Sequence, residues 1–378
     1  MNDDFATAMR RSLQQTRAGN PVEATRLIQE ALRGGRGGAS DLPPVSSAHR
    51  SGHRSDVEEA EVVETTPPRR PLGKVVAGLR NRPQGFSGQG LRMPQPVTAP
   101  GVPPGARFER RQFKGPVGAR DYRLYLPSTH GSGIAGLVVM LHGCTQSPED
   151  FAAGTAMNAQ AEQHGFAVIW PEQTRMHNPS LCWNWFRATD QRRSGEPAIL
   201  HAIAASVADE FSVPDVFVAG LSAGGAMAAI LAQNYAETFS AVGVHSGLAP
   251  GSAQDVVSAF GAMRGDTAGA TEALRAPVIV FHGTDDRTVA PVNVSRITGP
   301  LSAETQRSGH AADQSGGRRF TVTGGRNATG HPVEVWSIEG SGHAWSGGSA
   351  SGSYTDPAGP DASAEMLRFF RQHKDGVR

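Results

Sequence analysis

The chain has 378 residues, of which 38% are hydrophobic and 19% charged, so it is long enough for one large domain or two ordinary ones. Its 36 Lys and Arg residues balance 35 Asp and Glu, and the formal net charge of +1 argues against a nucleic-acid partner. No segment approaches the roughly 20 apolar residues that span a bilayer, and the acidic start at Asp3 and Asp4 is unlike a secretory signal, so we expect a soluble, cytoplasmic protein.

The N-terminal part divides into a helical and a proline-rich segment. Residues 1–35 predict a short helical hairpin, because apolar residues such as Phe5, Met9 and Leu13 recur at helical spacing. Residues 36–105 predict a disordered linker rich in Pro and Arg, since 11 of the 26 prolines lie there and few apolar side chains could offset the entropy of ordering.

Residues 106–378 predict a single α/β domain. Alternating apolar and polar residues at 108–114 and 121–126 predict an antiparallel hairpin. Short apolar runs, typical of strands covered on both faces, follow at 137–141, 166–170, 216–219, 241–244, 278–281 and 333–338. Helical patterns lie between several of them, at 152–164, 198–211 and 226–236. These elements predict a mostly parallel sheet flanked by helices, with the hairpin at its leading edge and the functional site at the carboxyl ends of the strands.

A nucleophile elbow is predicted where the run at 216–219 ends. The sequence Gly220-Leu221-Ser222-Ala223-Gly224 follows this strand directly and precedes a helical pattern. Glycines on both sides of the serine allow a cramped turn that lifts its hydroxyl above the sheet. We therefore take Ser222 as the candidate nucleophile.

A serine nucleophile needs a base and a carboxylate that orients the base. Asp285 and Asp286 follow the strand at 278–281, and His343 follows the strand at 333–338. Serine, acid and then histidine is the order typical of an α/β-hydrolase. Spacing alone leaves open which of the two aspartates orients His343.

Two backbone amides are needed to stabilise the oxyanion of the tetrahedral intermediate. One is expected from Ala223, the residue after the nucleophile. The other is expected from Cys144, in the turn His142-Gly143-Cys144 after the strand at 137–141, with the His142 side chain in a structural role.

Motifs spread over the domain resemble those of the polyhydroxybutyrate depolymerase family of esterases, related to feruloyl and acetylxylan esterases. The resemblance covers about residues 107 to 372 and rests on motifs in the family's order. They are His142-Gly143-Cys144-Thr145-Gln146, Cys182-Trp183-Asn184-Trp185-Phe186, Gly220-Leu221-Ser222-Ala223-Gly224-Gly225, His282-Gly283-Thr284-Asp285-Asp286 and Gly342-His343-Ala344-Trp345.

The resemblance implies an α/β-hydrolase fold and a serine esterase with no metal and no organic cofactor. The family pattern places the catalytic acid on Asp286, with Val289 in register. Implied substrates are short hydroxybutyrate or other polyhydroxyalkanoate oligomers, or small acyl or feruloyl-type esters. The family's secreted polymer depolymerases usually carry a signal and a separate polymer-binding domain. We expect neither in this protein, so attack on crystalline extracellular polymer is not expected; an extracellular location is the alternative that the family suggests.

The two family motifs that contain cysteine also predict the surroundings of the site. Cys144 and Cys182 form a disulfide between the two turns or remain reduced thiols, and the sequence leaves both open. Trp183, Trp185 and Trp345 are expected to line the substrate site. The charged residues after the aromatic loop are expected to form a solvated rim; they are Arg187, Asp190, Arg192, Arg193 and Glu196.

Two alternatives to an ester hydrolase stay open in the sequence. An acyltransferase would use the same triad and pass the acyl group to an acceptor other than water. A docking protein would use the hairpin of residues 1–35 to bind a granule or a partner. The sequence does not define an oligomeric state.

Overall fold

A computed structural model of the protein describes residues 100–266, 272–311 and 317–374. The predicted hairpin of residues 1–35 and residues 36–99 of the predicted linker lie outside these ranges. None of the helices in the described ranges has the length and apolar character needed to cross a membrane.

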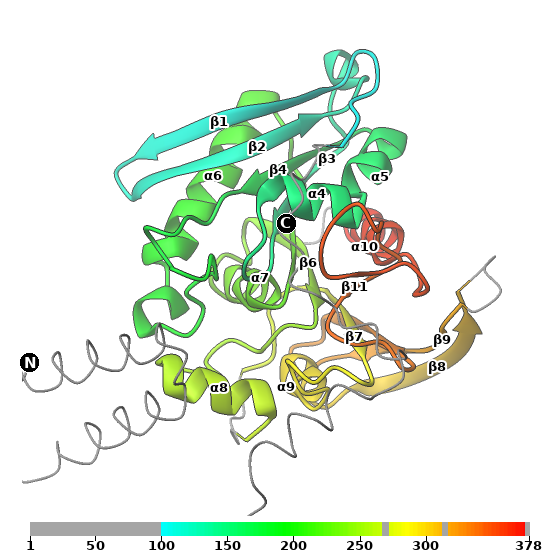
Figure 1. The fold of residues 1–378 in the computed structure, drawn as a ribbon. Coiled ribbons are helices and arrows are strands. Elements are labelled where there is room, and N and C mark those ends of the chain that lie inside the picture. The colour runs from blue at the N-terminus through cyan, green and yellow to red at the C-terminus, as the bar shows by residue number, and fades with distance from the viewer. Residues whose placement is uncertain (1–99, 267–271, 312–316, 375–378) are drawn as a thin grey trace, which may run out of the picture. The chain divides into compact units, whose positions relative to one another are not determined.

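The described part of the chain forms a large, mostly parallel sheet (Figure 1). Its strands are β1 (Arg107–Gly115), β2 (Gly118–Leu126), β3 (Gly136–Leu141), β4 (Phe166–Pro171), β5 (Val216–Leu221), β6 (Phe239–His245), β7 (Val278–Gly283), β8 (Ser302–His310), β9 (Arg319–Arg326) and β10 (Pro332–Ile338). They are ordered β1-β2-β4-β3-β5-β6-β7-β10-β9-β8. The six strands from β4 to β10 in this order run parallel, and antiparallel pairs flank them at both edges. The prediction of a parallel sheet with a leading antiparallel hairpin is confirmed.

Helices cover both faces of the sheet. They are α4 (Pro148–Thr155), α5 (Met157–His164), α6 (Gly195–Phe211), α7 (Ala223–Asn234), α8 (Val256–Arg264), α9 (Asn293–Thr298) and α10 (Ala362–Gln372), with 3-10 turns η1 (His130–Ser132) and η2 (Ala188–Gln191). Apolar residues of α6, α7, α8 and α9 share one core with alternate residues of the central strands. Those of α4, α5 and α10 pack on the opposite face. Strands such as β3 are buried at every position because both faces are covered, which explains their unbroken apolar sequences.

Two features of the domain differ from the expected elements. The helical pattern at 152–164 is divided between α4 and α5, because Ala156 takes a left-handed conformation with φ 54° and ends α4. Helix α4 begins earlier than expected, where Ser147 accepts a hydrogen bond from the Asp150 amide and Pro148 occupies the first turn. Strands β8 and β9 extend the sheet beyond β10. Strand β8 has a polar sequence and is almost wholly exposed, whereas β9 alternates only briefly, at Phe320 and Val322, which face the core. A short second sheet joins β11 (Trp345–Ser346) and β12 (Thr355–Asp356).

Candidate active site

Ser222 lies in a tight turn between β5 and α7. Its φ of 58° is the left-handed region that side-chain-bearing residues rarely adopt, as a nucleophile elbow requires. The turn needs small neighbours: a Cβ on Gly224 would lie 2.0 Å from the Leu141 carbonyl oxygen, and one on Gly220 would lie 2.4 Å from the Gly224 backbone. The glycines therefore allow α7 to approach β3 and β5 closely enough to place Ser222 above the sheet.

Asp286, not Asp285, contacts His343. The His343 Nδ1 donates to Asp286 Oδ2 over 2.7 Å, while Oδ1 of the same carboxylate accepts from the amides of Thr288 and Val289, each at 2.9 Å. The Asp286 side chain is fully buried and Asp285 is exposed. Burial alone would raise the pKa of Asp286, but the hydrogen bonds and charges of its partners, His343 first, lower it below its ordinary value. Asp286 therefore stays a carboxylate and fixes the His343 proton on Nδ1.

The turn after β3 presents a free backbone amide. Gln146 Oε1 accepts from the Gly143 amide at 2.9 Å, and the Thr145 amide donates to the Ser180 carbonyl at 2.9 Å. Within the described residues, neither the Cys144 amide nor the Ala223 amide donates a hydrogen bond. Both residues line the same cleft as Ser222 and His343, so two unoccupied N–H donors are available beside the nucleophile.

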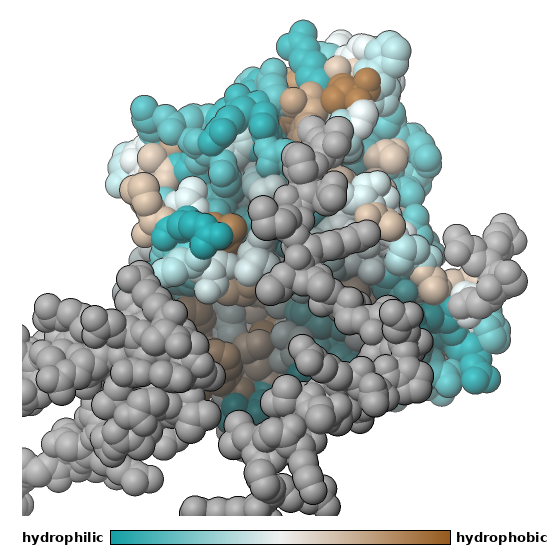
Figure 2. Space-filling model, viewed as in Figure 1, coloured by the Kyte–Doolittle hydropathy of each residue, from teal (hydrophilic) through white to brown (hydrophobic). Residues whose placement is uncertain are grey.

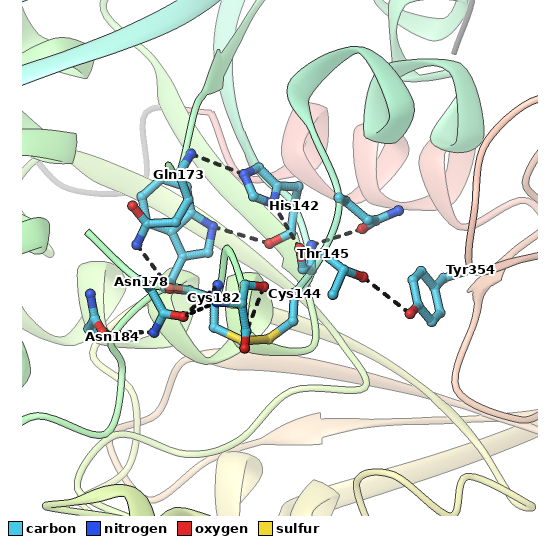
Figure 3. The surroundings of a disulfide bond; sticks show 12 residues. His142, Cys144, Thr145, Gln173, Asn178, Cys182, Asn184 and Tyr354 are labelled. Atoms are coloured by element: carbon cyan, nitrogen blue, oxygen red, sulfur yellow. Dashed lines mark hydrogen bonds between the residues drawn. A yellow bond between two sulfur atoms is a disulfide. The ribbon is translucent and has the colours of Figure 1, made fainter. Parts of the chain in front are cut away.

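A disulfide joins the two turns that the sequence left as bridged or reduced. Cys144 and Cys182 are bonded, with their Cα atoms 4.2 Å apart (Figure 3). Behind the bridge, the Trp183 indole donates to the His142 carbonyl at 3.1 Å. The His142 ring donates from Nδ1 to the Gly143 carbonyl at 2.8 Å and accepts from the Gln173 amide at 3.2 Å. Burial lowers the pKa of His142 to about 4, which keeps this ring neutral and structural.

The expected aromatic wall is partly wrong. A cleft of about 580 Å³ is lined by Trp185 and Phe186 but by neither Trp183 nor Trp345, which are 0% and 1% exposed. The Arg120 guanidinium carbon lies over the Trp183 ring, 5.6 Å from the ring centroid, and Trp183 packs in the core. The Trp345 ring forms a T-shaped pair with Phe151 in the core, and its indole N–H donates to the Ser363 hydroxyl at 3.1 Å. Both indole N–H groups donate to acceptors inside the protein, so both side chains have a structural role.

Sequence reasoning missed several residues of the cleft. Val256, Phe260 and Met263 of α8 line one side, and Tyr354, from the segment between β11 and β12, lines the cleft as well. Phe260 is 58% and Tyr354 49% exposed, and Figure 2 shows hydrophobic surface gathered in a hollow beside α8. The spacing of the three apolar residues of α8 is helical and could have been noticed. Tyr354 lies among Gly and Ser residues, where no pattern signals a binding role.

The expected solvated rim is also partly wrong. Arg187, Arg192 and Arg193 are exposed, but Asp190 and Glu196 are buried. Glu196 accepts from the Asn184 amide at 2.7 Å and from the side chains of Asn184 and Gln173 at 2.9 and 2.5 Å. The Glu196 carboxylate is buried because it accepts hydrogen bonds from polar groups of the aromatic loop that would otherwise lack a partner. These groups come together only when the loop folds, so the sequence pattern did not predict the burial.

Fold and site together define an α/β-hydrolase. The solved acetyl xylan esterase from Aspergillus awamori matches with a TM-score of 0.51 and 20% identity, covering 62% of this chain and 94% of that one. In the described residues, no group of three His, Cys, Asp or Glu side chains is placed to hold a metal ion.

The family follows from the sequence comparisons. The family described as "Esterase PHB depolymerase" matches residues 120–325, more than half of the chain, and the protein belongs to it. Poly(3-hydroxyalkanoate) depolymerase C from Paucimonas lemoignei is 32% identical over 232 residues, 55% of this chain and 55% of the relative. Poly(3-hydroxybutyrate) depolymerase from Ralstonia pickettii is 26% identical over 250 residues, 58% of this chain and 50% of the relative. The chain thus spans about half the length of these curated relatives.

Proposed function

We propose that the protein is a serine ester hydrolase in which Ser222 is the nucleophile, His343 the base and Asp286 the residue that orients the base. The observation that carries this proposal is the 2.7 Å hydrogen bond from His343 to Asp286 beside a cleft that Ser222 and His343 both line. Membership in an esterase family supports the same reaction class.

Each group has a defined task in the proposed reaction. Because the His343 proton lies on Nδ1 toward Asp286, Nε2 is free to accept the proton of the Ser222 hydroxyl as the oxygen attacks the ester carbonyl. The amides of Cys144 and Ala223 donate to the resulting oxyanion. His343 then returns the proton to the departing alcohol, leaving an acyl group on Ser222. A water molecule repeats the sequence and releases the acid.

The shape and chemistry of the cleft favour an apolar acyl group. Its volume of about 580 Å³ is in the range of small-molecule sites, and its walls include Trp185, Phe186, Leu248 and Phe260. Short hydroxyalkanoate oligomers and small acyl or aryl esters fit this description, in keeping with the names of the relatives. A panel of 4-nitrophenyl esters from acetate to octanoate, with a hydroxybutyrate trimer and a methyl ferulate, would rank these classes by kcat/KM.

Hydrolysis of 4-nitrophenyl butyrate by Ser222→Ala tests the reaction class. We expect kcat/KM to fall by at least about 10³-fold, because the other hydroxyls that line the cleft, those of Thr145, Ser180, Thr288 and Tyr354, do not lie on the turn between β5 and α7. Ser295→Ala is the matched control, since that exposed hydroxyl lies on α9 and, among the described residues, donates to the Val292 carbonyl alone. Undiminished turnover by Ser222→Ala would refute the assignment.

We also propose that the protein works in an oxidising compartment, contrary to the cytoplasmic location expected from the sequence. The support is the Cys144–Cys182 disulfide, because such bonds persist mainly outside the reducing cytosol. Alkylation of unreduced cell extract followed by mass spectrometry measures the thiol state. Recovery of both cysteines as alkylated thiols would contradict this location.

A further inference from the structure

His245 lies at the end of the strand between the nucleophile and the acid. Strand β6 pairs with β5 on one side and β7 on the other, so His245 is aligned with Leu221, just before Ser222, and with Phe281, which precedes the acid loop. The side chain is 1% exposed, does not line the cleft and has no role in the proposed reaction.

The backbone and side chain of His245 contact different parts of the site. Its carbonyl oxygen accepts from the Ser222 amide at 2.9 Å, which fixes the elbow from behind. Its Nε2 accepts from the amide of Ser346 at 3.0 Å, 101 residues further along the chain. The ring also stacks on Trp345, with centroids 5.1 Å apart, and on Phe281 at 5.8 Å. Ser346 and Trp345 immediately follow the segment that carries His343.

The hydrogen bonds define the tautomer of the ring. Because the Ser346 amide is a donor, Nε2 must accept, and the proton lies on Nδ1, which is 3.2 Å from the Ser246 hydroxyl. Burial first, and then the neighbouring His282 and His343 rings, lower the pKa of His245 to about 3 against the opposing effect of Asp286. The acceptor at Nε2 is therefore present throughout the neutral and mildly acidic pH range.

We propose that His245 is a positioning residue, whose side chain holds the loop carrying His343 at the correct distance from Ser222 while its backbone holds Ser222 itself. The inference rests on the ester hydrolase function proposed above. It assigns to one residue, through its backbone and its side chain, the alignment of Ser222 with His343. Alignment within about 1 Å is worth on the order of 10²-fold in rate.

The test compares variants that keep or remove the acceptor. His245→Phe keeps a flat ring for stacking but leaves the Ser346 amide without a partner, and His245→Gln places an amide oxygen near the position of Nε2. With 4-nitrophenyl butyrate, we expect kcat per active site to fall about 100-fold in His245→Phe with KM changed less than about threefold, and His245→Gln to recover at least about tenfold of that loss. Active sites are counted with a phosphonate ester that phosphonylates the Ser222 hydroxyl stoichiometrically and releases its alcohol leaving group, with the reaction run to completion, so loss of folded protein does not lower the measured kcat.

A second histidine supplies the matched control. His201 stacks on Tyr235 at 4.0 Å and bonds to the Thr238 hydroxyl at 2.9 Å, away from the cleft. His201→Phe should leave kcat per site within about twofold. Should His245→Phe fail to fold, His245→Asn replaces it, because its amide reaches only the Nδ1 position; His245→Gln must then be at least about tenfold faster than His245→Asn.

The outcomes separate this inference from the function on which it rests. Equal kcat per site in the wild type and His245→Phe, or in the Gln and Asn variants, overturns the positioning role while Ser222→Ala still reports on the reaction. Full activity of Ser222→Ala overturns the esterase proposal itself, whatever the His245 variants show.

Discussion

The disulfide between the oxyanion turn and the aromatic loop can stabilise the fold, align the site or do both. Replacing Cys144 and Cys182 together by Ser removes the bridge and keeps every backbone group. The two residues are 38 positions apart, and closing a loop of that length in the unfolded chain lowers its entropy by about 13 cal/mol/K, or about 4 kcal/mol at 25 °C. For a domain of this size, that loss corresponds to a fall in Tm of roughly 10 °C.

The same turn is also held by contacts that the substitution leaves in place. The Thr145 amide still bonds to the Ser180 carbonyl, the Gly143 amide to Gln146, and the Trp183 indole to the His142 carbonyl. Two of these bonds join the same pair of segments as the disulfide. We therefore expect kcat to fall by less than about tenfold, well below the 10²-fold or greater loss that removal of an oxyanion donor causes.

Urea unfolding and initial rates with 4-nitrophenyl butyrate measure the two effects on the same samples. Wild-type protein treated with a phosphine reductant should reproduce the double variant, and the reductant should not change the variant itself. A fall in kcat of more than 100-fold with less than about 1 kcal/mol lost in unfolding free energy would refute this reasoning, because the bridge would then act by alignment and not by chain entropy.

Three further predictions concern single residues. Asp286→Asn should lower kcat by about 10⁴-fold by releasing the His343 tautomer, whereas Asp285→Asn should stay within about threefold; equal losses would contradict the assignment. Trp185→Ala should raise KM for apolar esters about tenfold, while Trp345→Ala should cost about 3–5 kcal/mol in unfolding free energy, since only Trp185 lines the cleft. His142, with its pKa lowered to about 4, should make the fold less stable as pH falls from about 6.5 to 4, because the unfolded chain binds the proton first. Its replacement by Gln should reduce that slope by up to about 1.4 kcal/mol per pH unit in urea unfolding, and an unchanged slope would show that this ring does not control it.

Local sequence was informative wherever a structure depends on neighbours in the chain. The turn around Ser222 needs glycines on both sides of the serine, and an apolar strand and a helical pattern border it. Buried strands such as β3 could be predicted from the sequence, because a strand covered by helices on both faces of the sheet is apolar at every position. Strand β8 is exposed along almost its whole length, so its residues need not be apolar and its sequence shows no strand pattern.

Adjacent residues with similar chemistry could not be distinguished in this way. Asp285 and Asp286 differ by one position, yet the turn exposes the first and buries the second against His343. Trp183 and Trp185 both belong to the aromatic loop, but only the second reaches the cleft. A tryptophan in a loop packs wherever a hydrogen-bond partner and an apolar surface coincide, and both depend on distant segments.

The sequence by itself determined the leading hairpin, the buried parallel strands, the elbow at Ser222 and the set of candidate partners, because periodicity and glycine placement act over a few residues. Only the tertiary structure decided which candidates meet. It joined Cys144 to Cys182, turned Trp345 into the core and placed α8 beside the cleft. These outcomes depend on contacts between segments far apart in the chain, whose geometry arises when the sheet and its two helical layers pack together.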